Sequence, residues 1–437
     1  MDPSTIGLVS LALMVLLIQL GIHIAVVLLL LSFVATWLIR GNVDIAGNLL
    51  AKAAETSLQS YSFGVIPLFV MMGLLVSASG VGRDTFAVAG YAFRRILAGL
   101  GMATVAANTV FAAINGSSIA SASVFTKLAV PELVRQGYNR RFSVGVVAGS
   151  SVLGMLIPPS LLLIFYGIVA EVSIGDLFTA GIVPGLILAG AFILTIAAMA
   201  RIRPSYVGDP TTDAEETSRL SAREITYKIG PITLLIVIVM GGIYGGVFTP
   251  VEAGGVGALA SLLLALARRS LTWRGFWKVL IETGFVTSSI SILIIAAHFY
   301  ASMLSLSRLP TVLGLWIETA DLSFGVLLLI YLAIVLLLGT VLDSVSIILI
   351  ALPLVQPVMV SMGVDMVWFG IITIIAVEVG LLTPPLGLSA FVIKANLDDP
   401  EISLNDIFIG AAPFAITMLI VLALIVFLPV LATGLIR

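Results

Sequence analysis

The sequence predicts an all-α polytopic membrane protein made of two copies of one pattern, with the copies inverted relative to each other. Of the 437 residues, 60% are hydrophobic and only 10% are charged, whereas a soluble domain has about 25% charged residues. Residues 115–159 and 342–385 each hold a small or polar tip, followed by a G-x-x-x-P-P break inside apolar sequence. Non-helical backbone is costly in lipid unless it lines an enclosed cavity. A duplicated pair of broken helices is typical of a secondary transporter's midplane binding site.

The two copies share landmarks at one offset of 226 residues, with no gap. The matched pairs are Ser118 and Ser344, Pro131 and Pro357, Gly137 and Gly363, Gly154 and Gly380, and the double prolines Pro158-Pro159 and Pro384-Pro385. A double proline and two glycines in step argue against coincidence, so we interpret the pattern as an internal repeat.

The first half begins with more apolar sequence than one span needs. Residues 8–39 exceed a span of about 20 residues, and a break at Gly21-Ile22-His23 gives two helices. Residues 42–61 are more polar and predict an interfacial amphipathic arm. Residues 62–81 form the third span, and residues 82–100 follow with three arginines.

Residues 102–133 predict a re-entrant hairpin that turns at 115–118, because each limb is too short to cross the membrane. Basic residues flank it on both sides: Arg94, Arg95, Arg135, Arg140 and Arg141. The positive-inside rule places both flanks in the cytoplasm. A segment that leaves one side and returns to it has re-entered rather than crossed.

Residues 142–171 predict a span split at 154–159, and residues 177–200 return to a basic end. Residues 201–228 are the one long polar stretch, which we interpret as a cytoplasmic linker between the halves.

The second half repeats this order. Spans at about 229–246 and 252–267 match the first pair, and Glu55-Thr56 recurs as Glu282-Thr283 near a second arm, followed by a long span to about residue 306. The cytoplasmic end is marked by Arg268, Arg269, Arg274 and Lys278.

The second hairpin, residues 324–362, lacks a basic cluster, so we place it on the periplasmic side. Residues 367–394 form the second split helix and 407–432 the last span. This gives ten spans plus two hairpins, both termini outside, and inverted repeats at 1–220 and 221–437.

Several stretches resemble one known family. They are NGSSIASASVFTKLAVPEL, the G-MLIPPS break, GTVLDSVSIILIALPL, GLLTPPLG, and GGIYGGVFTPVEA at 241–253. The chain resembles, over essentially its full length, the large membrane subunit of tripartite ATP-independent periplasmic (TRAP) transporters, the DctM-like proteins. One departure is Val251, where the family usually has threonine.

The resemblance implies a fold similar to divalent-anion/sodium symporters and an elevator mechanism, with the hairpins and split helices as transport domain and the other helices as scaffold. It also implies sodium-coupled import of organic acids through a bacterial inner membrane. The implied partners are a small four-helix membrane subunit and a periplasmic substrate-binding protein. Sodium is the coupling ion, and no other cofactor is expected.

A sodium ion needs several oxygen ligands, which unwound backbone can supply without placing charge in the membrane. The first predicted sodium site consists of Asn115, Ser117, Ser118, Gly154 and Pro158. The second consists of Gly339, Asp343, Ser344, Gly380 and Thr383. Proline frees the carbonyl four residues before it, which for Pro158 is Gly154 and for Pro384 is Gly380.

Helices that start at the tips also aim positive dipole ends at the centre, which suits a carboxylate substrate. The predicted substrate-binding residues are Asn115, Ser118, Ser344, Pro159 and Pro385. The alternative for any single glycine or serine is close helix packing, in which such residues are common.

Four ionisable residues at apparent membrane depth leave alternatives open. Asp343 could ligate sodium or cap a helix. Glu378 could carry protons, pair with a basic group, or face the partner subunit. For His23 and His298, a satisfied polar group at a helix interface is preferred to a ligand or a proton relay.

The sequence holds no cysteine, no P-loop and no common hydrolase motif, and no basic stripe for nucleic acid. Two other functions remain open. One is a stand-alone sodium/dicarboxylate symporter, although its usual S-N-T tips are absent here. The other is an intramembrane enzyme that uses Asp343 and Glu378.

Overall fold

The described residues of the computed structural model are 2–208, 220–320, 322–397 and 399–436. The first half contains α1 (Pro3–Gln19), α2 (Ile24–Arg40), α3 (Val43–Gln59), η1 (Tyr61–Gly64), α4 (Val65–Ala78), α5 (Val81–Phe93), α6 (Gly99–Asn115), α7 (Ser118–Arg135), α8 (Arg140–Ser151), α9 (Leu153–Leu156), α10 (Leu161–Ala170), α11 (Ile174–Ile202) and α12 (Pro204–Val207).

The second half contains α13 (Ala222–Tyr244), α14 (Pro250–Ala267), α15 (Trp273–Ser307), α16 (Leu309–Thr319), α17 (Phe324–Gly339), α18 (Ser344–Ser361), α19 (Met366–Leu381), α20 (Leu388–Asn396), α21 (Leu404–Phe427) and α22 (Val430–Thr433). The helix starts repeat the offset of 226 residues at α2 and α14, α7 and α18, α8 and α19, and α12 and α22. The repetition therefore extends well beyond the landmarks in the sequence.

The predicted breaks are confirmed. His23 separates α1 from α2 and accepts the backbone N–H of Ala25 on its Nδ1 at 3.3 Å. The hairpins are α6–α7 and α17–α18. The first split helix bends by 42° between Leu156 and Leu161. The second is interrupted between α19 and α20, and both double-proline peptide bonds are cis.

The arm predicted in the second half is part of one continuous helix, α15, and is not a separate element. In the first half, Ser60 is extended and separates α3 from η1 and α4, whereas α15 runs unbroken for 35 residues. Pro67 lies in the first turn of α4, where proline favours a helix start. The corresponding position in the second half is Leu293, which allows the helix to continue.

Fewer long spans are found than the ten predicted. Among the described residues, seven helices are long and apolar enough to cross a membrane, or eight when the bent pair counts as one span. One of the seven, α18, is a hairpin limb. The helices α1, α2 and α19 are apolar but have only 16 or 17 residues. The predicted linker at 201–228 is shortened by the ends of α11, α12 and α13, and its residues 209–219 lie outside the described ones.

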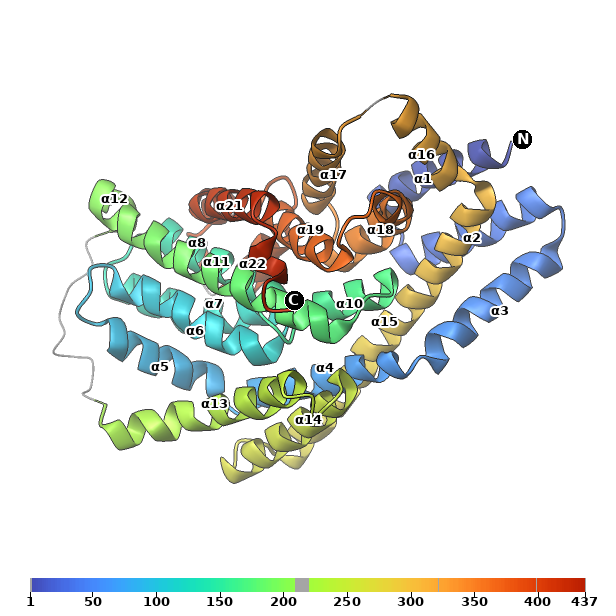
Figure 1. Cartoon of the computed structure of the whole chain (residues 1–437). Coiled ribbons are helices and arrows are strands. Elements are labelled where there is room, and N and C mark those ends of the chain that lie inside the picture. The colour runs from blue at the N-terminus through green and yellow to red at the C-terminus, as the bar shows by residue number, and fades with distance from the viewer. Residues whose placement is uncertain (1, 209–219, 321, 398, 437) are drawn as a thin grey trace.

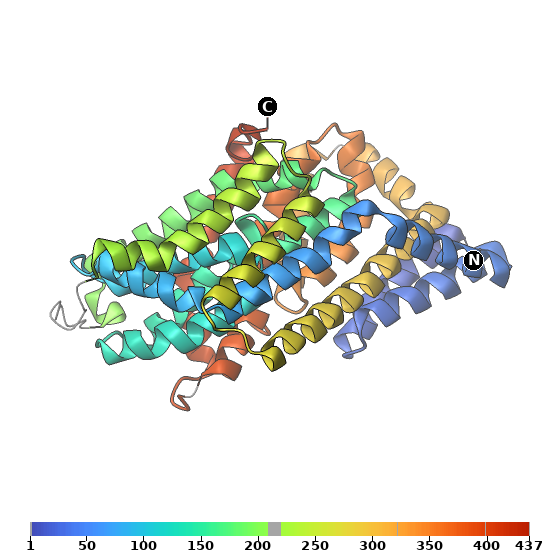
Figure 2. The ribbon, with the colours of Figure 1, turned by 90° about the horizontal axis from the view of Figure 1, so that it is seen from below.

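The split helices form the centre of the molecule. Every residue of α8 from Phe142 to Ser151 is buried, as is every residue of α19 from Trp368 to Leu381. Helices α2, α3 and α15 lie to one side, and α13 and α14 run along the edge beside α4 (Figure 1). The view from below shows the same separation, with α15 passing next to α2 and α3 (Figure 2).

The hairpins enter this centre from opposite ends. On the first hairpin, Ser123 in the tip-proximal part of α7 donates to Asn396 at the end of α20 (2.9 Å), and just beyond the hairpin base Arg140 pairs with Asp399 (3.1 Å). At the base of the second, Gln356 on α18 donates to the carbonyl of Ala170 at the end of α10 (2.9 Å). Each hairpin thus contacts the end of the other half's split helix. The inversion of the two halves relative to the membrane stays a prediction.

Candidate functional site

The first hairpin tip rests on the first helix break. Gly116 ends α6 with φ +63°, and its carbonyl accepts the N–H of Leu161, the first residue of α10, at 3.1 Å. A Cβ atom on Gly116 would lie 2.7 Å from the carbonyl oxygen of Pro159. A Cβ atom on Gly154 would lie 2.8 Å from the backbone of Ser117. Only glycine at these two positions allows tip and break to approach this closely.

The second tip repeats this arrangement. The carbonyl of Thr340 accepts the N–H groups of Leu386 (3.0 Å) and Gly387 (3.3 Å). Gly339 and Gly380 are in direct backbone contact, because a Cβ atom on Gly339 would lie 2.7 Å from the Cα atom of Gly380. For these two glycines the structure shows the packing role that the sequence left open.

The residues that begin α7 and α18 cap them. Ser117 accepts the N–H of Ala120 at 3.3 Å. At the equivalent position, Asp343 Oδ2 accepts the N–H groups of Val345 and Ser346, both at 3.1 Å, and the Ser346 hydroxyl donates to Oδ1. The predicted N-cap role of Asp343 is therefore confirmed. Its alternative role as a sodium ligand stays a prediction.

The expected free carbonyl occurs in one copy only. In the first copy, the N–H of Ile157 donates to the carbonyl of Leu153. The next residue, Pro158, has no N–H to donate, so the Gly154 carbonyl receives no helical hydrogen bond. In the second, the Gly380 carbonyl accepts the N–H of Thr383 at 2.9 Å. The prediction that Pro384 leaves Gly380 free is wrong, because the chain tightens by one residue at the end of α19 and closes an i to i+3 bond.

The two tips meet at Glu378. The Ser344 hydroxyl donates to Glu378 Oε1 at 3.0 Å, and the Ser118 side chain lies beside the same carboxyl. All three residues are buried, with exposed fractions of 5%, 1% and 2% respectively. The repeat-related serines thus lie beside one acid, and Ser344 is hydrogen-bonded to it. No local sequence pattern could reveal this, because the three residues come from two hairpins and α19.

The remaining predicted residues lie around this junction. Asn115 donates from Nδ2 to the carbonyl of Ser117 at 3.2 Å and packs against Gly73 of α4. The Thr383 hydroxyl donates to the carbonyl of Val379 at 2.8 Å. Pro158 and Pro159 are buried, whereas the equivalent Pro384 and Pro385 are exposed.

This difference in exposure follows from what covers each break. Gly181 and Gly185 of α11 pack closely against Leu156 and Ile157 and cover the first break. The second break leaves Leu386 44% exposed. The first break is therefore closed and the second is open.

Helix N-termini converge at these breaks. The starts of α7 and α10 meet at the first break, and the starts of α18 and α20 meet at the second. Each start carries a positive dipole end, while caps such as Ser117 and Asp343 accept part of the backbone N–H groups there. The arrangement can bind a carboxylate through N–H groups and serine hydroxyls, while carbonyl and carboxylate oxygens can hold a small cation.

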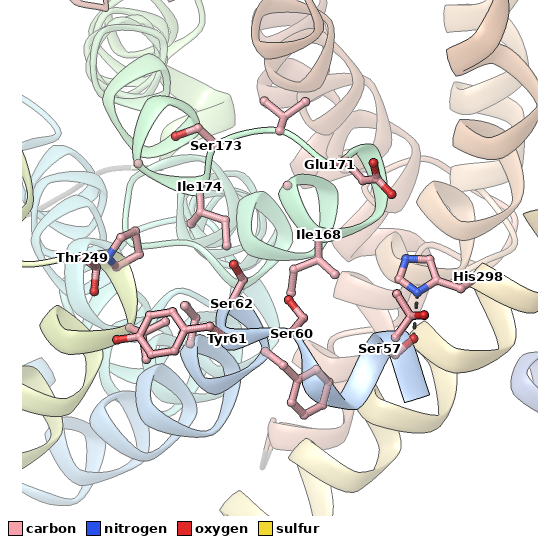
Figure 3. Close-up of a pocket in the computed structure, with 18 residues that line it drawn as sticks. Ser57, Ser60, Tyr61, Ser62, Ile168, Glu171, Ser173, Ile174, Thr249 and His298 are labelled. Atoms are coloured by element: carbon pink, nitrogen blue, oxygen red, sulfur yellow. Dashed lines mark hydrogen bonds between the residues drawn. The ribbon is translucent and has the colours of Figure 1, made fainter. Parts of the chain in front are cut away.

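A separate cavity of about 600 Å³ lies between the end of α3, the α10–α11 connection and the start of α14. Figure 3 shows Glu171 and Ser173 on one side of it and Ser60 to Ser62 on the other. His298 Nδ1 and Ser57 Oγ are 2.8 Å apart, the dashed line in Figure 3. His298 is therefore a satisfied polar group between α15 and α3, as predicted, and no predicted sodium or substrate residue lines this cavity.

Comparison with known proteins points to one family. Residues 11–431 match the family described as "Tripartite ATP-independent periplasmic transporter, DctM component". The chain is 34% identical over 393 residues to the C4-dicarboxylate TRAP transporter large permease protein DctM of Pseudomonas aeruginosa, covering 90% of each chain. It is 30% identical over 383 residues to the sialic acid TRAP transporter large permease protein SiaM of Vibrio cholerae, covering 87% of this chain and 88% of that protein.

Among solved structures, the YdaH transporter of Alcanivorax borkumensis superposes with a TM-score of 0.63 over 88% of both chains, at 15% identity. At that identity the likeness concerns the fold alone. It agrees with the predicted membrane architecture of re-entrant hairpins and discontinuous helices.

Proposed function

Because this chain belongs to the DctM-component family of tripartite ATP-independent periplasmic transporters, we propose that it imports an organic acid across a bacterial inner membrane, coupled to sodium. The observation that carries the proposal is the pair of hairpin tips seated on the pair of helix breaks, with Ser344 of the second tip hydrogen-bonded to the buried Glu378. The positive dipole ends of the four helix starts, with the N–H groups that the caps leave free, would bind the carboxylate. Sodium would bind at the two predicted sites.

The substrate class follows from the chemistry that the relatives' names share. One relative is named for C4-dicarboxylates and another for sialic acid, and both are carboxylic acids. A site built from N–H groups and hydroxyls suits the carboxylate common to both. We propose that a periplasmic binding protein delivers the acid and that a small four-helix membrane subunit completes the transporter.

We further propose an elevator movement. Residues 1–220 and 221–437 would be inverted repeats, with the hairpins and split helices as the transport domain and α1–α4 and α13–α15 as main scaffold elements. One break is covered by α11 and the other is open, which supports access from one side at a time. Movement of the transport domain would uncover the first break and cover the second.

The test is uptake into proteoliposomes of the purified chain with its small subunit and its binding protein. Labelled succinate and labelled sialic acid are the probes, each with an inward sodium gradient or with choline in its place. Accumulation that needs both sodium and the binding protein is the expected result.

Other outcomes would assign other functions. Uptake without the binding protein would indicate a stand-alone symporter. Conversion of the acid without any gradient would indicate an enzyme. Accumulation that is equal in sodium and choline would refute the sodium coupling.

A further inference from the structure

Glu378 lies near the end of α19, where every neighbouring residue of the helix is buried. Its Oε1 accepts the Ser344 hydroxyl, but Oε2 has no hydrogen-bond partner within the described part of the chain. A buried polar atom without a partner is unusual in a native structure and needs an explanation. Here the unpaired oxygen belongs to an acid that touches both hairpin tips.

Within the described part of the chain, no basic side chain forms an ion pair with this acid. The ion pairs found among the described residues involve Glu132, Asp399, Glu401, Asp406 and Asp84, and none involves Glu378. A carboxylate in the membrane interior costs several kcal/mol without a counter-charge. Neutral hydroxyls offset only part of that cost. Either a proton on the carboxyl or a bound cation next to Oε2 would remove the remaining cost.

The neighbouring groups suit a small cation. A serine hydroxyl that donates its hydrogen to the carboxylate keeps lone pairs with which to accept or ligate. Ser344, which donates to Glu378, and the neighbouring Ser118 therefore add oxygens to those of the carboxyl. Glu378 is also three residues from the last residue of α19, and the C-terminal end of a helix favours a positive charge.

We propose that Glu378 is a sodium ligand shared by the two hairpin tips, so that one ion ties Ser118 and Ser344 together. This inference rests on the sodium coupling proposed above and adds a ligand that lies outside the two predicted sodium sites. Loading of one tip then favours ordering of the other. The negative charge of the carboxylate would also neutralise the bound sodium ion, so the loaded transport domain would carry one positive charge fewer.

The experiment measures the sodium dependence of thermal unfolding of the purified full-length chain, with choline chloride keeping ionic strength constant. Glu378→Gln retains the shape and removes the charge. We expect it to raise the half-saturating sodium concentration at least roughly tenfold, which corresponds to about 1.4 kcal/mol. Glu378→Asp keeps the charge but shortens its reach, so its half-saturating concentration should fall between those of wild type and Glu378→Gln.

The matched control is Glu55→Gln. Glu55 is exposed on α3 and accepts a hydrogen bond from Gln59, so its replacement should leave the sodium curve unchanged. If Glu378→Gln does not fold, Glu378→Asp carries the test alone, and a wild-type sodium curve in that variant contradicts the proposal.

Three further outcomes would overturn the inference. A wild-type sodium curve in Glu378→Gln would show that sodium binds without this carboxylate. Unchanged sodium binding together with uptake that has lost its pH dependence would show that the acid carries a proton. A wild-type chain that does not respond to sodium would refute the sodium coupling itself, which distinguishes that failure from the first two.

Discussion

Gly116→Ala tests whether the first tip must sit on the first break. Gly116 and Gly41 are both C-caps in the left-handed region, with φ of +63° and +67°. A Cβ atom on Gly116 would lie 2.7 Å from the carbonyl oxygen of Pro159, whereas a Cβ atom on Gly41 would meet nothing within 4 Å. Gly41→Ala therefore has the same backbone cost without the clash.

The expected magnitudes follow from these two differences. The left-handed conformation costs an alanine about 1–2 kcal/mol, and this applies to both variants. Forcing extra atoms into close packing costs about 1–3 kcal/mol more, and this applies to Gly116→Ala only, because the contact is with rigid backbone. If the seated tip is needed for ion binding, that difference weakens sodium binding by about 5- to 150-fold.

The assay is the half-saturating sodium concentration for uptake in proteoliposomes, together with the thermal unfolding midpoint of each variant. Gly41→Ala should lower the midpoint slightly and leave the sodium dependence intact. Gly116→Ala should shift the sodium dependence. Equal sodium curves for the two variants would refute the idea that contact between tip and break builds the site.

Three further predictions concern other contacts. Gly339→Ala should lower the free energy of unfolding by about 1–3 kcal/mol, because its Cβ atom would meet α19. Gly325→Ala on the same helix has open space around it and should leave the stability unchanged. Equal thermal midpoints of the two variants would contradict this prediction. Asp84→Ala should lower the free energy of unfolding by about 2–4 kcal/mol, between the values for surface and fully buried ion pairs. The reason is that Lys228 (2.9 Å) and a largely buried Arg268 lose their shared partner. A change below about 0.5 kcal/mol in chemical denaturation would count against it. Asp343→Asn should retain the cap and most uptake, whereas Asp343→Ala should cost about 1 kcal/mol; loss of sodium dependence in the asparagine variant would instead make Asp343 an ion ligand.

The elements that the sequence predicted well are those with a local physical signal. The tips, the double-proline breaks and the boundary at His23 interrupt apolar runs, and each disrupts the helix by its own chemistry. The hairpin bounds at 324–362 agree with α17 and α18 within about a residue. The continuous α15 was missed, although the signal existed: Leu293 stands where the first half has Pro67.

The site was predicted less completely because it depends on contacts between distant segments. Glu378 stood out as an acid at membrane depth, but its hydrogen bond to Ser344 joins two helices, and no periodicity reports such a pairing. Gly380 was predicted from the position of Pro384. The i to i+3 bond of Thr383 depends on how the helix end tightens, which proline spacing does not determine.

The reciprocal seating of the hairpin bases has a consequence for biogenesis. Arg140 and Arg141 of the first half form their ion pairs with Asp399, Glu401 and Asp406, which are synthesised more than 250 residues later. An N-terminal fragment that leaves the ribosome alone thus has basic side chains without their partners and a split helix without its support. Assembly must therefore finish after the last fifth of the polypeptide has been inserted. If the chain is produced as two fragments divided at the central connection, each fragment should become stable only when the other is produced in the same cell.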